Sequence, residues 1–214
     1  MARSKNDRVT VLLVDDHAVV REGYRQLLER HGDIVVVGEA ADASEAHALF
    51  CKLSPQIVVM DITLPSLSGL EAMRRMLDHE PGTRVLIFSM HEDVIFAKRA
   101  LQAGAFGYVT KASAPSVLVE AVHTVASGKK YLSAAVAQAL ALRAETLDEA
   151  ATNGLSAREF EVLRQLVKGQ SIKDIAHSMG INPKTVSNHQ SVIRQKLGAD
   201  SAVQLLSIAK KLGL

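Results

Sequence analysis

The sequence predicts an α/β domain followed by a small all-α domain. Residues 9 to about 127 alternate five short apolar runs with segments of helical periodicity, which is the pattern of strands that are each followed by a helix. From residue 152 onward only helical patterns occur, and cap residues stand at their starts. The length of 214 residues also favours two domains over one. We therefore expect a doubly wound, five-stranded parallel sheet and then a four-helix unit.

The expected strands and helices of the front domain alternate along the chain. The strands are residues 9–14, 34–38, 56–60, 84–88 and 106–109, and the helices are residues 17–30, 43–53, 69–79, 93–102 and 114–126. Right-handed crossovers between parallel strands leave few topologies. The most favoured is the flavodoxin-like order 2-1-3-4-5, in which strands one and three are neighbours.

The composition is that of a globular protein. A hydrophobic content of 48% and a charged content of 22% argue against a disordered chain. The first eight residues are polar, and no long apolar stretch follows them, so we expect neither a signal peptide nor a transmembrane segment, and a cytoplasmic protein without a membrane partner. Cys51 is the only cysteine, which excludes an intramolecular disulfide and a cysteine zinc site. We expect it to be an inert, partly buried thiol.

Carboxylates follow two strands that are neighbours in the expected sheet. Asp15 and Asp16 follow the first strand, and Asp61 follows the third. Such sheets bind ligands at the carboxyl ends of their strands, so the three side chains should meet in one crevice. A single strand-ending aspartate often only caps the next turn. Three that converge repel one another unless a cation lies among them.

Mg²⁺ suits such a crevice because it prefers hard oxygen ligands and takes one or two carboxylates together with phosphate oxygens. With Mg²⁺ and a phosphoryl donor present, one carboxylate can act as a nucleophile and form an aspartyl phosphate. Ser89 and Lys111 follow the fourth and fifth strands and offer phosphate a hydroxyl and a compact cation. Taken alone, they are interpreted as a turn serine and a surface lysine.

Five segments of the front domain carry a resemblance to a known family: VDDH (14–17), MDITLP (60–65), SGLE (68–71), FSMHED (88–93) and GAFGYVTK (104–111). Through them the domain resembles the receiver domain of two-component response regulators. The resemblance implies that Asp61 accepts a phosphoryl group. It also implies that Asp61, Asp16 and the backbone carbonyl of Thr63 bind Mg²⁺, with Asp15 acting through water.

The same resemblance implies that Ser89 is the switch hydroxyl, Tyr108 the switch aromatic and Lys111 the partner of phosphate. Without it, Tyr108 is interpreted as a ring that fills the edge of its strand. Many receivers follow this lysine with proline across a cis peptide, whereas Ala112 follows Lys111 here. A cis bond without proline costs about 3–4 kcal/mol, so the isomer of this bond stays open. We expect His17 at a helix start rather than as a metal ligand.

The domain boundaries follow from where these patterns end. Residues 1–8 are a tail, residues 9–128 the receiver-like domain and residues 129–151 a linker. The stretch 133–151 is rich in alanine and favours a short helix before a flexible tether; the alternative is one continuous helix that joins the domains. Residues 152–214 are the second domain.

The second domain is basic and contains three helix starts. Residues 152–214 hold nine Lys and Arg against four Asp and Glu, whereas the rest of the chain holds 16 against 19. This asymmetry predicts contact with a polyanion, the alternative being a solvated surface. Gly180 supplies the tight turn of a helix-turn-helix. The helix starts are marked by Ser156 with Glu159, Ser171 with Asp174, and Asn182 with Pro183.

The helix expected at residues 183–197 has two different faces. Val186, Ile193 and Leu197 form an apolar face. A face of hydrogen-bond donors with few acidic groups suits insertion into a major groove, whereas the alternative is an ordinary amphipathic helix in a small bundle. The donors are Lys184, Ser187, Asn188, Ser191 and Arg194.

Residues 155–162 and 185–197, with Ile175-Ala176 between them, resemble the LuxR-type DNA-binding domain. A receiver joined to this domain is the architecture of the NarL/FixJ class of response regulators. The resemblance also implies that the helix at residues 201–212 is a dimer surface. Ser187, Gln190 and Arg194 depart from the commonest family pattern, so the operator sequence cannot be carried over. The implied contacts are to phosphates by Lys173, Lys184 and Thr185, and to bases by Ser187, Asn188 and Ser191.

These expectations describe a transcription regulator controlled by phosphorylation. A sensor histidine kinase would phosphorylate Asp61 in a Mg²⁺-dependent reaction and favour a homodimer that binds double-stranded DNA at paired half-sites, with RNA polymerase as a further partner. One alternative is a constitutive DNA-binding protein whose front domain is never phosphorylated, against which the complete acidic pocket argues. The other is a phosphatase-type enzyme that uses Asp61, against which the DNA-binding tail argues.

Overall fold

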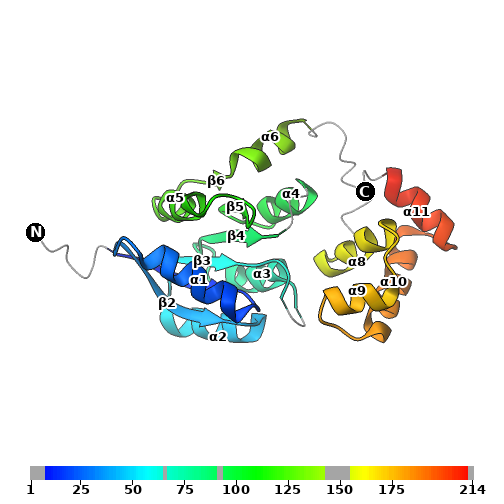
Figure 1. Ribbon diagram of the computed structural model, residues 1–214, viewed down its shortest axis with the longest axis horizontal. Helices are drawn as coiled ribbons and strands as arrows, with labels where there is room; N and C mark the ends of the chain where they lie inside the picture. Colours follow the sequence, from blue (N-terminus) through cyan, green and yellow to red (C-terminus); the bar gives the residue numbers. More distant parts are fainter. Residues whose placement is uncertain (1–7, 65–66, 91–93, 143–154, 212–214) are drawn as a thin grey trace, which may run out of the picture. The chain divides into compact units, whose positions relative to one another are not determined.

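The computed structural model describes residues 8–64, 67–90, 94–142 and 155–211. The chain divides into two compact units, Met1–Ala141 and Leu142–Leu214. The first is an α/β unit and the second contains only helices (Figure 1), so both predicted fold classes are confirmed. Among the described helices, none is long and apolar enough to cross a membrane.

The first unit is built on a six-stranded parallel sheet. The order 2-1-3-4-5 predicted for the first five strands is confirmed, with β1 between β2 and β3. The predicted number of strands was one too few, because residues assigned to the linker add a sixth. The strands, in the order β2-β1-β3-β4-β5-β6, are β1 (Val9–Val14), β2 (Ile34–Ala40), β3 (Ile57–Met60), β4 (Val85–Ser89), β5 (Gly107–Thr110) and β6 (Tyr131–Leu132).

The sixth strand is short and depends on a glycine in its neighbour. β6 pairs in parallel with Gly107 and Tyr108 of β5. A Cβ at Gly107 would lie 2.5 Å from the carbonyl oxygen of Tyr131, so only glycine lets the two strands approach this closely. Two residues cannot show an alternating or apolar pattern, which is why the sequence did not predict β6.

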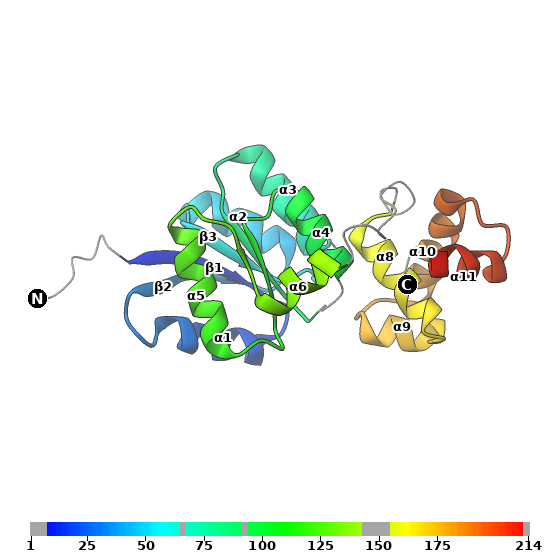
Figure 2. The ribbon, with the colours of Figure 1, turned by 90° about the horizontal axis from the view of Figure 1, so that it is seen from above.

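Helices cover both faces of the sheet (Figure 2). Helices α1 (Ala18–Glu29) and α5 (Pro115–Ala126) pack on one face, where their apolar residues join those of the first five strands in one core. Helices α2 (Ala43–Leu53), α3 (Gly69–His79) and α4 (Val94–Gln102) lie on the other face. Every residue of β3, β4 and β5 is buried, which explains why these strands are continuous apolar runs. Helix α6 (Ala134–Leu142) follows β6.

The start of α3 lies against the carboxyl end of β3. Ser68 caps the helix by accepting a hydrogen bond from the Glu71 amide at 3.3 Å, and the Gly69 amide donates to the Ile62 carbonyl at 2.8 Å. A Cβ at Gly69 would lie 1.8 Å from the carbonyl oxygen of Asp61, which no side chain tolerates. Glycine therefore permits the approach that positions the backbone of Asp61.

The second unit is a bundle of the helices α8 (Ala157–Val167), α9 (Ile172–Ser178), α10 (Pro183–Leu197) and α11 (Ala202–Lys211). Gly180, with a φ of 61°, turns the chain between α9 and α10. The core of this second unit includes the buried side chains of Phe160, Leu163, Ile175, Val186 and Ile193. The predicted helix starts are confirmed: capping boxes join Ser156 to Glu159 and Ser171 to Asp174, and Asn182 caps α10.

Three single residues discussed in the sequence have a defined place. Cys51 on α2 is exposed, so the expectation of a partly buried thiol was wrong. The Lys111–Ala112 peptide is trans, as is every peptide bond in the described segments. His17 occupies the N-cap position of α1, as expected for a helix start, but its side chain forms no capping hydrogen bond.

Replacing Gly69 with alanine should destabilise the first unit. The new Cβ must displace the Asp61 carbonyl or the start of α3, and overpacking of this kind costs about 1–3 kcal/mol or more. We expect a lower midpoint of urea unfolding, measured by circular dichroism on the full chain. Gly82→Ala is the matched control, because a Cβ at Gly82 meets no atom within 4 Å. Equal midpoints for the two variants would contradict the steric argument.

Candidate functional site

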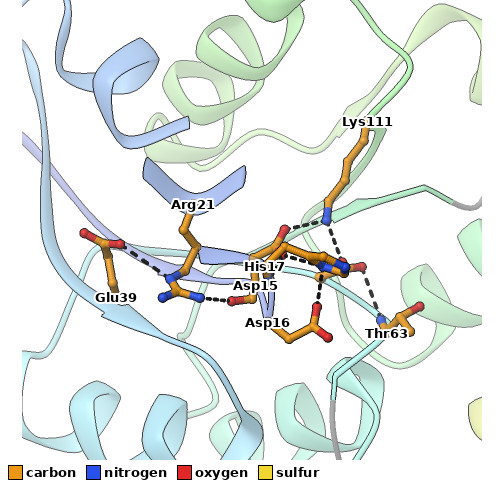
Figure 3. Close-up of polar contacts among 8 residues, drawn as sticks. Asp15, Asp16, His17, Arg21, Glu39, Thr63 and Lys111 are labelled. Carbon is orange, nitrogen blue, oxygen red and sulfur yellow. Dashed lines mark hydrogen bonds and ion pairs between the residues drawn. The ribbon is translucent and has the colours of Figure 1, made fainter. Parts of the chain in front are cut away.

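Polar residues stand at the carboxyl ends of four neighbouring strands, and Figure 3 shows the side chains of Asp15 and Lys111 there. Asp15 follows β1, Asp61 follows β3, Ser89 ends β4 and Lys111 follows β5. Backbone hydrogen bonds hold these ends side by side: the Asp61 amide donates to the Val14 carbonyl at 2.9 Å, and the Lys111 amide to the Ser89 carbonyl at 2.8 Å. The structure therefore brings together residues that lie far apart in the sequence.

The ammonium group of Lys111 lies between two carboxylates. Its Nζ donates to Asp61 Oδ2 at 2.6 Å and also to Asp15 Oδ2. All three side chains are almost completely buried. Two carboxylates and one ammonium leave this trio with an excess of negative charge when all are ionised.

Burial and this excess charge shift the protonation equilibria of the pocket. Burial raises the pKa of Asp61; the Lys111 ammonium opposes the shift only in part, and Asp15 adds to it. Burial alone would lower the pKa of Lys111, but the facing carboxylates of Asp61 and Asp15 outweigh it and leave that pKa raised. The two shifts differ in origin: that of Asp61 comes mainly from burial, which favours the neutral acid, whereas that of Lys111 shows that the two carboxylates favour a positive charge between them.

The side of the pocket around Asp16 is more open. Asp16 Oδ1 lies 2.7 Å from Nδ1 of His17, and the same nitrogen lies 3.4 Å from Asp15 Oδ1. The Thr63 amide donates to Asp61 Oδ1 at 3.2 Å, so the two oxygens of Asp61 have different partners. Among the described residues, Asp15, Asp16 and His17 form the one group of such side chains whose ligand atoms lie close enough together to hold a metal ion.

Arg21 secures the backbone at the end of β1, and the sequence did not predict this. Its guanidinium donates to the carbonyl oxygen of Asp15 and lies 3.5 Å from Glu39 on β2 (Figure 3). Glu39 in turn accepts a hydrogen bond from Arg25 at 2.8 Å. One signal was available: Arg21 stands in the first turn of α1, where the helix dipole disfavours a cation, so an arginine there indicates another partner.

The two residues expected to act as a switch are both buried. Ser89 and Tyr108 have no exposed surface. They lie on the neighbouring strands β4 and β5, where Ser89 pairs with Thr110 and Tyr108 with Ile87. In this structure the ring of Tyr108 therefore fills the interior next to β6.

Most of the residues expected to contact DNA lie on the surface of α9 and α10. Ser187 is half-buried, and its hydroxyl donates to the Pro183 carbonyl at 3.1 Å. The exposed ones are Lys173, Lys184, Thr185, Asn188 and Ser191. These are short polar groups and lysines on two consecutive helices, as a helix-turn-helix that meets a polyanion requires.

Arg194 has a structural partner inside the second unit. Its guanidinium donates to the carbonyl oxygens of Ala199 and Asp200, just beyond the end of α10. These bonds hold the turn that leads into α11. The donor face predicted from the sequence included Arg194, and a contact between Arg194 and DNA stays a prediction beside these bonds.

Helix α11 exposes apolar side chains. Val203 is 77% exposed and Leu206 39%, whereas Leu205 and Ala209 of the same helix are buried. The helix thus has one face in the bundle and a second apolar face on the surface of its unit. Exposed apolar surface of this kind is typical of an interface.

An ion pair joins α8 to α10. Lys196 Nζ donates to Glu159 Oε2 at 2.7 Å, and the same oxygen accepts the Ser156 amide at 2.6 Å in the capping box. Burial alone would raise the pKa of Glu159, but the hydrogen bonds from Lys196 and from Ser156 outweigh it, so that the pKa is lowered. Folding therefore stabilises the carboxylate form of Glu159.

Both units match known families. Residues 11–123 match the family described as response regulator receiver domain, and residues 153–209 match the luxR family of bacterial regulatory proteins. The chain is a response regulator of the NarL/FixJ class. The two resemblances noted in the sequence, to a receiver and to a LuxR-type domain, are thereby confirmed.

Known response regulators share this architecture over nearly their whole length. Response regulator UvrY of Escherichia coli K12 is 34% identical over 96% of this chain and 95% of its own. Transcriptional regulatory protein UhpA of Salmonella typhimurium is 36% identical over 92% of this chain and 95% of its own. Transcriptional activator protein ExaE of Pseudomonas putida is 38% identical over 95% of this chain and 97% of its own. Such relatives regulate transcription, which decides against a phosphatase-type enzyme.

Solved structures of response regulators share the fold. A LuxR-family two-component response regulator from Aurantimonas sp. SI85-9A1 matches with a TM-score of 0.63 and 47% identity, covering 64% of this chain and 98% of that one. The response regulator RcsB in its complex with DNA matches with a TM-score of 0.61 and 26% identity, covering 96% of this chain and 99% of that one.

The Glu159–Lys196 pair should make the stability of the second unit depend on pH. Because folding lowers the pKa of Glu159, the stabilisation is present above the pKa of the unfolded chain and is lost as the pH falls through the folded value. Glu159→Gln should lower the free energy of unfolding by about 1 kcal/mol at about pH 7, and the difference from wild type should shrink toward zero below about pH 4. Urea unfolding at several pH values measures this. A difference that persists undiminished in acid would show that charge is not its origin.

Proposed function

We propose that Asp61 is the phospho-acceptor of this response regulator and that a sensor histidine kinase supplies the phosphoryl group. The observation that carries the proposal is the position of the Asp61 carboxylate, which directly follows β3 and lies in a pocket with Asp15 and Lys111. Its two oxygens are oriented by the Thr63 amide and the Lys111 ammonium. A nucleophile held in this way needs little further ordering before it reacts.

In the transfer, a carboxylate oxygen of Asp61 attacks the phosphorus of a phosphohistidine on the kinase. The new O–P bond forms as the P–N bond breaks, and the leaving imidazole keeps the electron pair and takes up a proton from water. The ammonium group of Lys111 donates to Oδ2 of Asp61. It can therefore pair with an oxygen of a phosphoryl group on Asp61 and balance the charge of that group.

Mg²⁺ is the cation that we assign to this pocket. The donors that fit it are the carboxylates of Asp15, Asp16 and Asp61 and the backbone carbonyl of Thr63, all of which are oxygen ligands. One observation supports the fit: the buried trio of Asp15, Asp61 and Lys111 carries excess negative charge when all three groups are ionised. When bound, the ion would neutralise phosphoryl oxygens during the transfer.

Ser89 and Tyr108 are assigned to the response that follows phosphorylation. A hydroxyl at the end of β4 can donate to a phosphoryl oxygen on Asp61, and such a bond would draw Ser89 toward the pocket. Tyr108 lies on the adjacent strand β5, so its buried ring has to accommodate that movement. The placement of both residues on strands that end at the pocket supports this assignment.

The second unit is assigned to double-stranded DNA. The complex of RcsB with DNA supports this, and a structure of two RcsB dimers bound to two DNAs supports a homodimer that reads paired half-sites. The exposed Val203 and Leu206 of α11 are suited to the dimer interface. The phosphate contacts are assigned to Lys173, Lys184 and Thr185, and the base contacts to Ser187, Asn188 and Ser191.

These assignments give each part of the chain a role. Residues 9–128 receive the phosphoryl group and residues 152–214 bind DNA, whereas the expected tail at residues 1–8 lies outside the described residues except for Arg8. Residues 129–151 connect the two and begin by adding β6 to the receiver sheet. A regulator of this kind works at the chromosome, so we place it in the cytoplasm, with RNA polymerase as a further partner.

Asp61→Asn should abolish phosphorylation while leaving the fold intact, because the amide has nearly the same shape but is not a nucleophile. The measurement is labelling of the full chain by a small-molecule phosphoryl donor with Mg²⁺, together with circular dichroism. Asp78→Asn is the control, since Asp78 is exposed on α3, and it should label like wild type. Persistent labelling of the Asp61 variant would refute the assignment.

Lys184→Ala should weaken DNA binding about equally for all sequences and reduce the slope of log affinity against log salt by about one. The reason is that a lysine at the start of α10 would neutralise one phosphate and release one counterion. Fluorescence anisotropy of the phosphorylated protein at several salt concentrations measures the slope. Lys52→Ala, which removes the same charge from the receiver, is the control; an unchanged slope for Lys184→Ala would exclude the phosphate contact.

A further inference from the structure

A cavity lies between α2 and α3, on the face of the sheet opposite to α1 and α5 (Figure 2). Its volume is about 500 Å³, which falls in the range of pockets that bind small molecules. The side chains that line it have no task in the function proposed above. The apolar part of its wall consists of Ala43 of α2, Ala72 of α3 and Leu67 of the segment that leads into α3.

The wall also carries side chains that can donate hydrogen bonds. Ser44 and His47 stand one turn apart on α2, and Arg75 comes from α3. The ring of His47 packs edge-on against the ring of His79, with 6.0 Å between their centroids, and its Nδ1 lies 3.8 Å from Sγ of Cys51. These contacts restrict the imidazole, so this part of the wall keeps its shape.

The guanidinium group of Arg75 is the strongest recognition element of the cavity. Among the described residues its ion pair is with Glu71, whose Oε1 lies 3.8 Å from Nε of Arg75. This separation is too long for a hydrogen bond, and an exposed pair within one helix contributes little. The flat fork of donors on Arg75 can therefore bind the carboxylate of a ligand through two parallel hydrogen bonds.

The acidic side chain in the wall is already engaged. Asp42 caps α2, where its Oδ1 accepts the amides of Ser44 at 2.8 Å and Glu45 at 2.9 Å. The carbonyl oxygen of Asp42 accepts the amide of Ala46 at 3.0 Å. The carboxylate therefore lies at the positive end of the helix dipole, which offsets its charge. Because the chain itself uses these amides, we assign the binding of an anion to the side chain of Arg75 and not to the helix end.

We propose that this cavity binds a small carboxylic acid with an apolar body. The carboxylate of the ligand pairs with Arg75 and accepts a further hydrogen bond from Ser44 or His47. Its apolar body lies against Ala43 and Ala72, where contact with the wall removes apolar surface from water. An uncharged analogue of the same shape keeps the apolar contact but loses the pairing with the guanidinium group.

Benzoate is a suitable probe, because it joins one carboxylate to one apolar ring, and benzamide is its uncharged counterpart. The full chain, labelled with ¹⁵N, is titrated with each compound at about pH 7, where the carboxylate is ionised, and amide spectra are recorded by NMR. We expect saturable shifts of the amides of Ser44, His47 and Ala72, with a dissociation constant of about 1 mM for so small a ligand. Benzamide should bind about tenfold more weakly.

Arg75→Gln should weaken the binding of benzoate about tenfold, because glutamine offers neither the charge nor the fork of the guanidinium group. Arg74→Gln is the matched control. Arg74 is the neighbouring residue of α3, is equally exposed and does not line the cavity, so this variant loses the same charge and should bind benzoate like wild type. Circular dichroism checks that both variants are folded.

Three results would overturn the proposal: no saturable shift at the cavity, equal affinity for benzoate and benzamide, or equal affinity of the two variants for benzoate. The first would show that the cavity is not a binding site, and the other two that it does not recognise a carboxylate. The titrations contain neither Mg²⁺ nor a phosphoryl donor. Their outcome is therefore independent of the assignment of Asp61, which is tested by labelling.

Discussion

The pocket depends on the ammonium group of Lys111. Without it, Asp15 and Asp61 would hold two carboxylates in a buried space with no opposite charge, which is strongly unfavourable. Because the ammonium comes from the end of β5, its contacts also fix the ends of β1 and β3 relative to that strand. The negative charge that it does not balance keeps the pocket receptive to a cation. The side chains of Asp15, Asp61 and Lys111 therefore both stabilise this part of the sheet and form the pocket that can bind a cation.

The backbone beneath the two carboxylates is held from both faces of the sheet. On one face, Arg21 of α1 donates to the Asp15 carbonyl. On the other, α3 begins so close to the Asp61 carbonyl that residue 69 has to be glycine. A carboxylate that accepts a phosphoryl group must be placed to within a fraction of an ångström. Here the helices that cover the sheet supply that placement, so their packing has a direct effect on the site.

The fold could be predicted because the buried parallel strands form continuous apolar runs in the sequence. Since these strands are parallel, their carboxyl ends lie together, and this brings Asp61 and Lys111 close to each other. The sequence does not reveal contacts in which the partner of a side chain is a backbone carbonyl. Arg21 binds the carbonyl of Asp15, and Arg194 binds two carbonyls after α10, and no pattern of side chains records either contact. The strand Tyr131–Leu132 was missed because its pairing depends on the approach of another strand rather than on its own residues.

That added strand means that the first residues of the linker are part of the receiver sheet. The Tyr131 amide donates to the Phe106 carbonyl at 3.0 Å, and the Ser133 amide to the Tyr108 carbonyl at 3.2 Å. The chain that leads to α6 is thus hydrogen-bonded to the strand that carries the buried tyrosine. Any displacement of β5 has to pull these residues along or break their bonds. The linker therefore starts as part of the sheet, so that a displacement of β5 reaches residues 131–133 directly.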